Sequence, residues 1–366
     1  MKVSCSQKDL TRALQTVKRA VPRRTTLPIT QNVLLAAEPG ELLRLSTTNL
    51  EMATTTWIEA EVEETGAITV PARSFAEMVA SLPQESITMA ATLDQDVLGL
   101  TCGATTAYID GTKAEEFPPI PEVEGVPLAK IAAEEIRTAI DQVINAAATD
   151  DTQPILTGVQ MEVEANSFTV AAADGFRLAV YTGHLLEPAA ATSGAVLLIP
   201  AASLKEVRRL IAKAAPQVEI TMAGNHVAFR IPNTTIVSQL IEGRFPNYSD
   251  LIPTEYSTRL LFDAQDMLRA VKILARVNQG IIRLQTEPGQ VILSAQCPGE
   301  AAMTSVVPAV LEGEKVKIAF NAAYLLAILP TLEQRGILEL SSSSSPGLFR
   351  GRNDSIQIVM PILMKW

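Results

Sequence analysis

An internal repeat with a period near 125 residues constrains the fold of this chain more than any other sequence feature. Three segments carry apolar residues at the spacing of one helix face, each after a short strand-like run. They begin at Leu10, Ile136 and Met267, which lie 126 and 131 residues apart. A second amphipathic stretch follows in each case, over residues 75–82, 204–212 and 324–329. The chain is therefore predicted to hold three copies, each with two strand, helix, strands halves.

Proline-rich segments mark the places where the copies should meet. They cover residues 117–127 and 245–253, and such punctuation is typical of connecting segments. We predict three domains over residues 1–125, 126–248 and 249–366. Between the helices, short alternating apolar runs broken by turn residues indicate strands. The expected class is α+β, and 366 residues suit two or three cores.

Composition points to a cytoplasmic protein. Hydrophobic residues make up 47% of the chain, yet no uncharged apolar run of membrane-spanning length occurs and the first residues do not resemble a signal peptide. Cys5, Cys102 and Cys297 are odd in number and far apart. That pattern argues against disulfides and metal clusters and favours free thiols in a reducing compartment.

Positive charge is clustered although the formal net charge is −10. Basic residues gather on three of the predicted helices and a following loop: Lys8, Arg12, Lys18, Arg19, Arg23 and Arg24, then Lys205, Arg208, Arg209 and Lys213, then Arg269, Lys272 and Arg276. One interpretation is a set of solvated helix faces. The other is a surface that contacts the phosphates of a polyanion without reading bases. Because these helices lack stacking aromatics, duplex DNA fits better than a single strand.

Catalytic signatures are missing from the sequence. The phosphate-loop, dinucleotide-binding, HExxH and CxxC patterns do not occur. His184 and His226 sit in turn or strand-edge contexts, and Asp150 and Asp151 are adjacent, as in a helix cap or exit. We predict no catalytic residue, no cofactor and no metal. A hydrolase remains one alternative, and a repeat-built carbohydrate binder, which would not explain the basic helices, remains another.

Several segments in fixed order resemble one known family over the whole chain. They are residues 24–29 (RTTLPI), 70–73 (VPAR), 154–159 (PILTGV), 173–179 (ADGFRLA), 245–248 (FPNY) and 359–362 (VMPI). Together with the threefold repeat, they are similar to the beta subunit of bacterial DNA polymerase III, the beta sliding clamp.

The resemblance implies a fold and a function. Three clamp-type domains would form a ring as a head-to-tail homodimer, which would encircle duplex DNA and tether DNA polymerase without catalysing a reaction. Implied partners are sequence-independent double-stranded DNA, the polymerase III alpha subunit, the clamp loader, and other polymerases and repair proteins that carry short peptide motifs. The protein would be cytoplasmic and nucleoid-associated, with no membrane partner. Family DNA contacts map onto Arg24 and Arg73.

The resemblance also implies an apolar cleft for partner peptides, formed by the second and third domains. Carried over residue by residue, it comprises Leu156, Ala173, Gly175, Phe176, Arg177, Leu178, Pro246, Leu251, Ile358, Val359, Met360, Pro361 and Ile362. This chain departs from a well-known member at Asp250, where that member has arginine, and at Pro154 and Ile155, where it has tyrosines. The tail over residues 363–366 extends beyond the usual ending, and Trp366 is expected to cover or extend the cleft.

Overall fold

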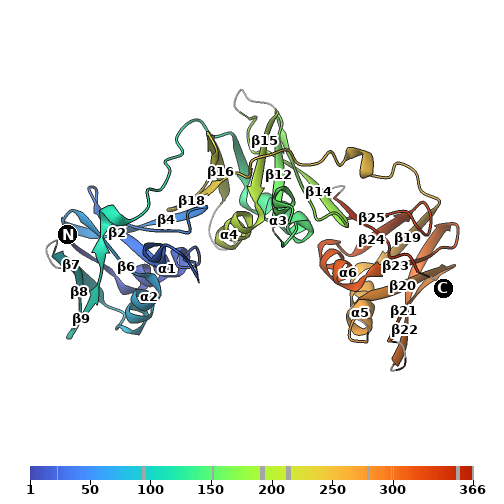
Figure 1. Cartoon of the computed structure of the whole chain (residues 1–366), viewed down its shortest axis with the longest axis horizontal. Helices are drawn as coiled ribbons and strands as arrows, with labels where there is room; N and C mark the ends of the chain where they lie inside the picture. The colour runs from blue at the N-terminus through green and yellow to red at the C-terminus, as the bar shows by residue number, and fades with distance from the viewer. Residues whose placement is uncertain are drawn as a thin grey trace. The chain divides into compact units, whose positions relative to one another are not determined.

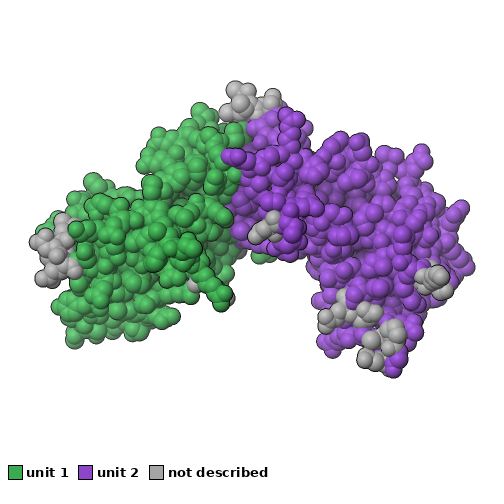
Figure 2. All heavy atoms as spheres, viewed as in Figure 1, with its two compact units in different colours: residues 1–133, 206–240 green, residues 134–205, 241–366 purple. Residues whose placement is uncertain are grey.

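The computed structural model describes residues 1–22, 24–92, 96–150, 152–189, 194–211, 216–277, 280–297, 299, 301–351 and 355–364. The chain divides into two compact units, coloured separately in Figure 2. Unit 1 holds residues 1–133 and 206–240, and unit 2 holds residues 134–205 and 241–366. The border between the units runs through the middle predicted copy, so the domain boundaries near residues 125 and 248 stay predictions.

The first copy contains both predicted halves in the expected order (Figure 1). Its first half is β1 (Lys2–Ser6), α1 (Gln7–Val17), η1 (Pro28–Gln31), β2 (Asn32–Glu38), β3 (Leu42–Thr48) and β4 (Met52–Glu59). After β5 (Glu61–Glu64), the second half is β6 (Gly66–Pro71), α2 (Ala72–Ser81), β7 (Ser86–Thr92), β8 (Val97–Cys102) and β9 (Thr105–Asp110). A short strand and a turn of 3-10 helix follow, β10 (Thr112–Lys113) and η2 (Ala114–Glu116).

The second copy repeats this order. Its first half is β11 (Ala129–Ala132), α3 (Ala133–Val143), η3 (Ile144–Ala146), η4 (Pro154–Thr157), β12 (Gly158–Val163), β13 (Ser167–Ala173) and β14 (Arg177–His184). Its second half is β15 (Ala195–Pro200), α4 (Ala201–Ile211), β16 (Gln217–Ala223), β17 (His226–Ile231) and β18 (Thr234–Gln239). The connector to the third copy contains η5 (Ser249–Leu251).

The third copy completes the array. Its first half is β19 (Thr258–Asp263), α5 (Ala264–Leu274), β20 (Ile281–Glu287), β21 (Gln290–Cys297) and β22 (Ala301–Gly313). Its second half is β23 (Lys317–Asn321), α6 (Ala322–Ile328), η6 (Leu329–Thr331), β24 (Arg335–Leu340), β25 (Gly347–Arg350) and β26 (Ile356–Val359). The predicted three-copy α+β architecture is therefore confirmed, with each helix in its predicted half.

Strand exchange joins the two halves of every copy. The first strand of each half pairs with the strands of the other half: β1 with β7 and β6 with β2, β11 with β16 and β15 with β12, β19 with β24 and β23 with β20. All of these pairs are antiparallel. Because neither half can complete its sheet alone, the halves of a copy should fold as one unit.

Neighbouring copies are joined through continuous sheets. Strand β4 pairs with β18, with Thr55 opposite Thr235, inside a nine-stranded sheet of unit 1. Strand β14 pairs with β26, with Leu178 opposite Ile358, inside a twelve-stranded sheet of unit 2. In both cases the last strand of the first half of one copy pairs with the final strand of the next. We call these the first and second junctions.

The helices each bury one face against these sheets. In α1 the buried residues Leu10, Ala13, Leu14 and Val17 follow helical spacing and join the core of the first copy. Helix α5 repeats that face in the third copy and is capped by Asp263, whose carboxylate accepts hydrogen bonds from the backbone N–H groups of Gln265 and Asp266. The faces opposite the cores stay exposed to solvent and carry the charged residues described below. No helix in the described part of the chain is both long and apolar enough to cross a bilayer.

Candidate functional site

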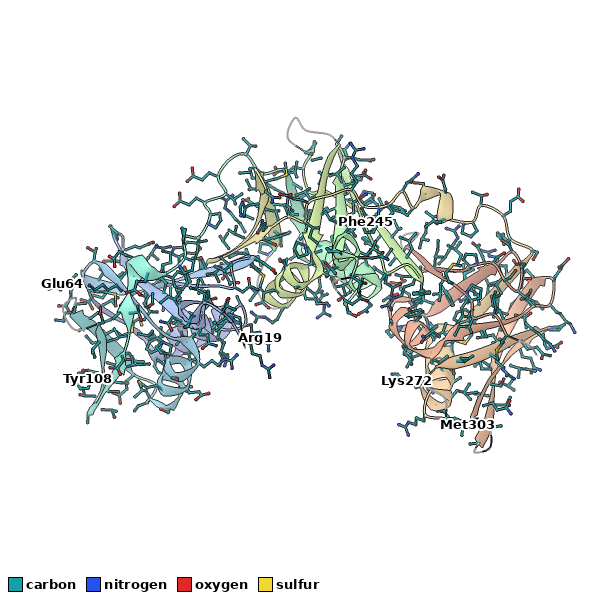
Figure 3. All side chains as sticks on the ribbon, viewed as in Figure 1. Arg19, Glu64, Tyr108, Phe245, Lys272 and Met303 are labelled. Atoms are coloured by element: carbon teal, nitrogen blue, oxygen red, sulfur yellow. The ribbon has the colours of Figure 1, made fainter. Side chains whose placement is uncertain are left out.

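Exposed cations cover the outer faces of α1 and α5. Lys8, Arg12, Lys18 and Arg19 are exposed on or just after α1, on the side away from its buried face. Figure 3 shows Arg19 extending away from the body of unit 1. Arg269, Lys272 and Arg276 are likewise exposed, although Arg269 is paired with Asp266 one turn earlier. Both helices thus present positively charged side chains to solvent, as contact with phosphates requires.

Helix α3 lacks this charge. It is the copy-two equivalent of α1 and α5, but it carries Glu134, Glu135 and Asp141 against a single basic residue, Arg137. Arg137 is itself paired with Glu134. Basic residues therefore cluster on α1, α4 and α5 but not on α3, so the clustering does not follow from the repeat.

Arg209 on α4 differs from the other predicted DNA-binding cations. Its guanidinium is paired with Glu206 and donates a hydrogen bond to the backbone carbonyl of Thr16 at 2.9 Å. Thr16 lies in the last turn of α1, so Arg209 satisfies a helix-terminal carbonyl and links the second copy to the first. Its partly buried side chain stabilises the first junction. Lys205 and Arg208 on the same helix are exposed.

The remaining predicted DNA contacts lie at two further places. Arg24 is exposed in the loop after α1, and Arg73 is exposed in the first turn of α2. Neither has an ion-pair partner among the described residues. Arg23, Lys213, Asp151, Lys365 and Trp366 lie outside the described residues, as does the side chain of Cys297.

A carboxylate organises the turn at the centre of the predicted partner cleft. Asp174 follows β13, and its Oδ1 accepts hydrogen bonds from the backbone N–H groups of Phe176 and Arg177, both at 3.0 Å. Its Oδ2 accepts a 2.8 Å bond from Nε of Arg177. Gly175 has a φ of +88°, which glycine adopts at no steric cost. The turn thereby holds the Phe176 side chain outward, where it is 63% exposed.

Arg177 links this turn to the third copy. The guanidinium carbon lies 4.5 Å from the ring centroid of Tyr324 on α6, in a cation–π contact. Partial burial raises the pKa of the Tyr324 phenol, and the nearby Asp174 carboxylate adds to this while Arg177 opposes it. The sequence prediction missed Tyr324, because its place in an amphipathic stretch gives no signal that it meets Arg177.

The second junction brings several predicted cleft residues together, but not all at the surface. Arg177 lies opposite Val359 and Leu178 opposite Ile358, and Met360 donates its N–H to the carbonyl of Phe176 at 2.8 Å. Leu178 is 4% exposed and Val359 is fully buried in the core of the third copy. Their place in the partner cleft therefore stays a prediction. Within the fold, their buried side chains stabilise the strand pair that positions Phe176 and Met360.

The connector between the second and third copies packs over this strand pair. Phe245 and Tyr248 meet edge to face with centroids 6.2 Å apart, and both pack against the buried cluster that includes Leu178 and Ile358. Burial, and secondarily the charge of Glu162, raises the pKa of Tyr248. Asp250 is exposed beyond them and accepts a hydrogen bond from the Asn247 amide at 3.3 Å. The connector thus carries a negative charge next to an apolar layer.

The other predicted cleft residues range from buried to exposed. Leu251 is exposed on η5, Met360 is 44% exposed, and Leu363 of the C-terminal tail is exposed. Pro361 and Ile362 are half-buried, with the Ile362 N–H bonded to the carbonyl of Ala319 at 2.7 Å. Leu156 is buried at the end of η4, beside Pro154 and Ile155, while Ala173 and Pro246 are not fully buried. We refer to Phe176, Leu251 and Met360 as the exposed apolar set.

The groups weighed for catalysis lie at strand ends and in a bend. His184 ends β14 and His226 begins β17. Asp150 accepts hydrogen bonds from the Thr152 hydroxyl and backbone N–H, which lower its pKa. Over the described ranges, no three His, Cys, Asp or Glu side chains are grouped in a way that could hold a metal ion.

Comparison with known proteins decides the family. Models of the DNA polymerase III beta subunit match residues 1–121 (N-terminal domain), 130–247 (central domain) and 249–363 (C-terminal domain). A beta sliding clamp from Synechococcus elongatus is 32% identical over 378 residues, covering both chains completely. The chain belongs to the DNA polymerase III beta subunit family. A further beta sliding clamp, from Streptomyces coelicolor, is 31% identical and covers 96% of this chain and 94% of the relative.

Solved structures of DNA polymerase III beta subunits share the fold over their full length. The sliding clamp of Bacillus subtilis superposes with a TM-score of 0.94 at 25% identity, covering 100% of both chains. A clamp from Pseudomonas aeruginosa, bound to griselimycin, gives 0.92 at 28% identity with the same coverage. Members of the DNA polymerase III beta family are non-catalytic sliding clamps in DNA replication, with DNA and polymerase as partners. The ring and the homodimer are standard for this family, and the three-copy chain fits them.

Proposed function

We propose that this chain closes a two-protomer ring through β9 and β22, threads duplex DNA past α1, α4 and α5, and holds partner peptides at the exposed apolar set beside Arg177. One observation carries this proposal. Copies one and two, and copies two and three, are joined by the same kind of strand pair, which leaves the equivalent strands of copies three and one, β22 and β9, without that partner among the described strands. Strand β9 is the last strand of the second half of the first copy and pairs only with β8 among the described strands. Among the residues that the structure describes, β22 pairs over residues 301–308 with β21 alone, because β19 reaches no further than Ala309.

The repeat supports a specific register for that missing junction. Strand β9 corresponds to β18 when their hairpin ends, Thr105 and Thr234, are aligned, and β22 corresponds to β4. Since Thr235 lies opposite Thr55 at the first junction, Thr106 should lie opposite Met303 of the partner subunit. Head-to-tail contacts of one kind in both protomers would close a ring.

Exposed apolar side chains on β9 and α5 support the same assignment of the dimer contact. Tyr108 on β9 corresponds to Val237 on β18 and is 72% exposed, whereas Val237 is buried beneath the connector residue Val123. Ile273 on α5 corresponds to Thr16 on α1, which receives Arg209 at the first junction, and is 51% exposed. Figure 3 labels Tyr108 and Met303 on the strands concerned. Isolated apolar residues are common on surfaces, but here they mark the positions that a neighbouring copy covers elsewhere.

Disulfide trapping tests the register directly. A Thr106→Cys, Met303→Cys double variant should form a covalent dimer under mild oxidation, because directly opposed residues have Cβ atoms within about 5.5 Å. A Thr106→Cys, Ser305→Cys variant, displaced by two residues, is the matched control and should crosslink far less. Equal crosslinking in both would contradict the register, and sedimentation showing only monomer at micromolar concentration would contradict the ring.

Retention on DNA separates a ring from an ordinary DNA binder. A protein with a net charge of −10 and scattered phosphate contacts should bind open DNA weakly and in a salt-sensitive way. Once loaded on a nicked circle, the ring should persist in high salt and leave when the circle is cut. Arg24→Ala or Arg73→Ala should weaken loading without altering the dimer. Equal release from circular and linear DNA would refute topological retention.

The partner surface extends the proposal to specific proteins. Partners would be the polymerase III alpha subunit, the clamp loader, and other polymerases and repair proteins with short peptide motifs, acting in the cytoplasm at the nucleoid. Phe176 and Met360 are exposed beside Arg177, and Leu251 is exposed on the connector, so the set offers apolar anchoring with one orienting charge. Griselimycin binding by the Pseudomonas aeruginosa clamp shows that a relative accepts a ligand. A fluorescent peptide with two apolar anchors should bind this chain and lose affinity in a Met360→Ala variant.

A further inference from the structure

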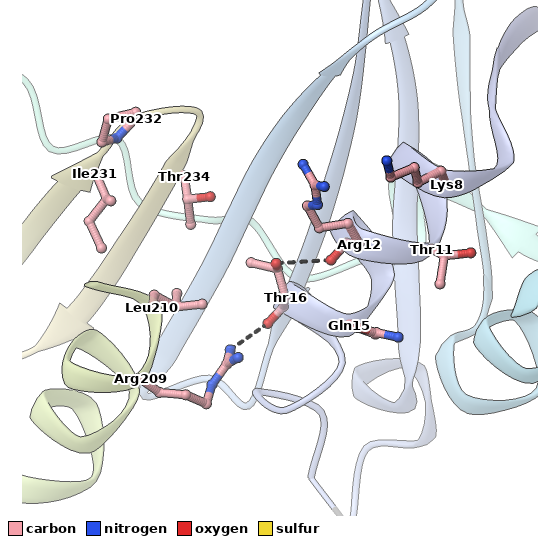
Figure 4. A pocket seen from close by; sticks show the side chains of 10 residues that line it. All are labelled: Lys8, Thr11, Arg12, Gln15, Thr16, Arg209, Leu210, Ile231, Pro232 and Thr234. Carbon is pink, nitrogen blue, oxygen red and sulfur yellow. Dashed lines mark hydrogen bonds between the residues drawn. The ribbon is translucent and has the colours of Figure 1, made fainter. Parts of the chain in front are cut away.

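A hollow lies in unit 1, apart in sequence from the residues of the partner surface. It has a volume of about 660 Å³ and lies between α1, the end of α4 and the turn that joins β17 to β18 (Figure 4). Six residues define its chemistry: Lys8, Arg12, Arg209, Leu210, Ile231 and Pro232. Its size falls in the range of small-molecule sites, about 300–1,000 Å³. We call it the first-junction pocket.

One wall of the first-junction pocket is cationic. Lys8 and Arg12 are one helical turn apart on α1 and therefore lie on the same face. Both are exposed and have no ion-pair partner among the described residues. Arg209 adds a third guanidinium from α4, although Glu206 offsets its charge. No aspartate or glutamate is among the described residues that line the pocket, so an anion entering it would meet uncompensated positive charge.

The opposite wall is largely apolar. Leu210 on α4, Ile231 at the end of β17 and Pro232 in the following turn line this side. Arg209 fixes the distance between the walls, because it hydrogen-bonds the Thr16 carbonyl across the junction. A pocket of this kind suits a ligand with an anionic end and a compact apolar body.

The charge of this pocket is a feature of the first copy and not of the repeat. With Leu10 aligned to Ile136 and Met267, Lys8 and Arg12 correspond to Glu134 and Thr138 in the second copy and to Gln265 and Arg269 in the third. Both cations occur together only on α1. Contact with DNA phosphates requires positive charge but does not require Lys8 and Arg12 to lie beside an apolar wall.

We propose that the first-junction pocket binds a small phosphorylated molecule of nucleotide size, with its phosphate at Lys8 and Arg12 and its body against Ile231 and Pro232. A phosphate matches two adjacent cations better than a single carboxylate does, because it offers three acceptor oxygens. The backbone of duplex DNA is a less suitable occupant. Its phosphates lie on a broad convex surface, and the bases that could fill the apolar side are stacked inside the duplex. The pocket therefore adds a ligand site to the clamp function and does not depend on it.

Calorimetric titration of the full-length protein with adenosine 5′-monophosphate at about 0.15 M ionic strength, where the Debye length is about 8 Å, tests this site. The wild type should bind, and Lys8→Gln with Arg12→Gln should weaken binding about tenfold or more through loss of two charge-assisted contacts. Lys18→Gln with Arg19→Gln is the matched control, since it removes the same charge from the end of the same helix outside the pocket. That control should stay within about twofold of the wild type once general charge effects are screened.

The apolar wall needs its own readout. Ile231→Thr keeps a β-branched residue in the strand but removes apolar contact, so it should weaken the nucleotide and leave inorganic pyrophosphate unaffected. Unchanged nucleotide affinity in Ile231→Thr would show that the wall contributes nothing and would overturn the nucleotide-sized assignment. Because Lys8 and Arg12 are exposed, their variants should keep the wild-type melting temperature, which a misfolded protein would not.

Three further outcomes would overturn the proposal. The nucleotide could fail to bind the wild type, or the pocket variant and the charge control could lose affinity equally. A 20-base-pair duplex could also displace the nucleotide in competition, which would assign the pocket to backbone phosphates instead. If the wild type neither binds nucleotide nor stays on circular DNA, both this proposal and the clamp assignment of the basic helices fail. Normal retention on circles without nucleotide binding would overturn the pocket alone.

Discussion

Asp174 offers a test of how the partner surface is held in place, because two substitutions should separate its roles. Asp174→Ala removes the acceptor for the Phe176 and Arg177 N–H groups and the ion pair to Arg177. Asp174→Asn removes the charge but keeps an oxygen at the Oδ1 position. Asn49 already performs this role at the first junction, where its Oδ1 accepts from the N–H groups of Glu51 and Met52 at 3.1 and 2.7 Å. The asparagine variant should therefore keep the turn.

The sizes of the two effects follow from the contacts. The Asp174 and Arg177 side chains are only 14% and 15% exposed, so solvent screens the pair weakly. Loss of a hydrogen bond to a charged group costs about 1.5–3 kcal/mol, and an ordinary hydrogen bond about 1 kcal/mol. Asp174→Asn should cost about 1–2 kcal/mol, since Arg177 keeps its contact with Tyr324. Asp174→Ala should cost about 2–4 kcal/mol because two N–H groups also lose their acceptor.

Hydrogen exchange gives a local assay, since unfolding of a three-copy chain need not be two-state. Peptides that contain Phe176 and Arg177 should exchange about tenfold faster for each 1.4 kcal/mol lost in Asp174→Ala, and clearly less fast in Asp174→Asn. Ultraviolet titration provides an independent readout: removing the Asp174 charge should lower the pKa of Tyr324, which stays above its ordinary value because burial remains. Equal exchange in the two variants, or an unchanged tyrosine titration, would refute this account.

Three further predictions concern the partner surface and a buried thiol. Met360→Ala should weaken peptide binding, measured by calorimetry, at an unchanged melting temperature. Val359→Ala, at a fully buried position, should lower the free energy of unfolding in urea by about 2 kcal/mol. A lower melting temperature with unchanged peptide affinity in Met360→Ala would show that Met360 belongs to the hydrophobic core. Asp250→Arg should raise affinity for acidic peptides and lower it for basic ones, with effects that shrink in high salt; no change would place Asp250 outside the site. Burial raises the pKa of Cys5 to about 12, so native protein should show no alkylation of Cys5 by iodoacetamide at pH 8 in mass spectra, and rapid labelling there would contradict its burial.

The sequence predicted the repeat and the helices well, because periodicity reports local structure directly. The stretches expected over residues 75–82 and 204–212 correspond to α2 (Ala72–Ser81) and α4 (Ala201–Ile211), shifted by one to three residues. The prediction placed the start of both helices too late, because the first turn of each helix precedes the apolar pattern. The exchange of β1 and β6 between halves could not be predicted, since strand pairing depends on contacts far apart along the chain.

The candidate site was predicted as a set of residues but not as a surface. Leu178, Val359 and Met360 look alike in sequence, yet the first two are buried and the third is exposed. Alternation along β26 cannot settle this, because Ile358 and Val359 are both buried, one under the connector and one in the core of the third copy. For Arg209, residue type suggested a phosphate contact, and only the fold reveals the Thr16 carbonyl that it binds.

Equivalent positions that differ between copies identify where this chain has specialised. Elements that two copies share build the junctions. Asn49 and Asp174 each accept a hydrogen bond from the backbone N–H three residues later, although only Asp174 is charged. Arg177 replaces Met52 at the second junction and gains Tyr324 as a partner. Tyr108 occupies the position equivalent to Val237. Val237 is buried with Val123, whereas Tyr108 is exposed. Since a structural requirement alone would act on all three copies alike, these single-copy departures are better explained by contacts with other molecules than by stability.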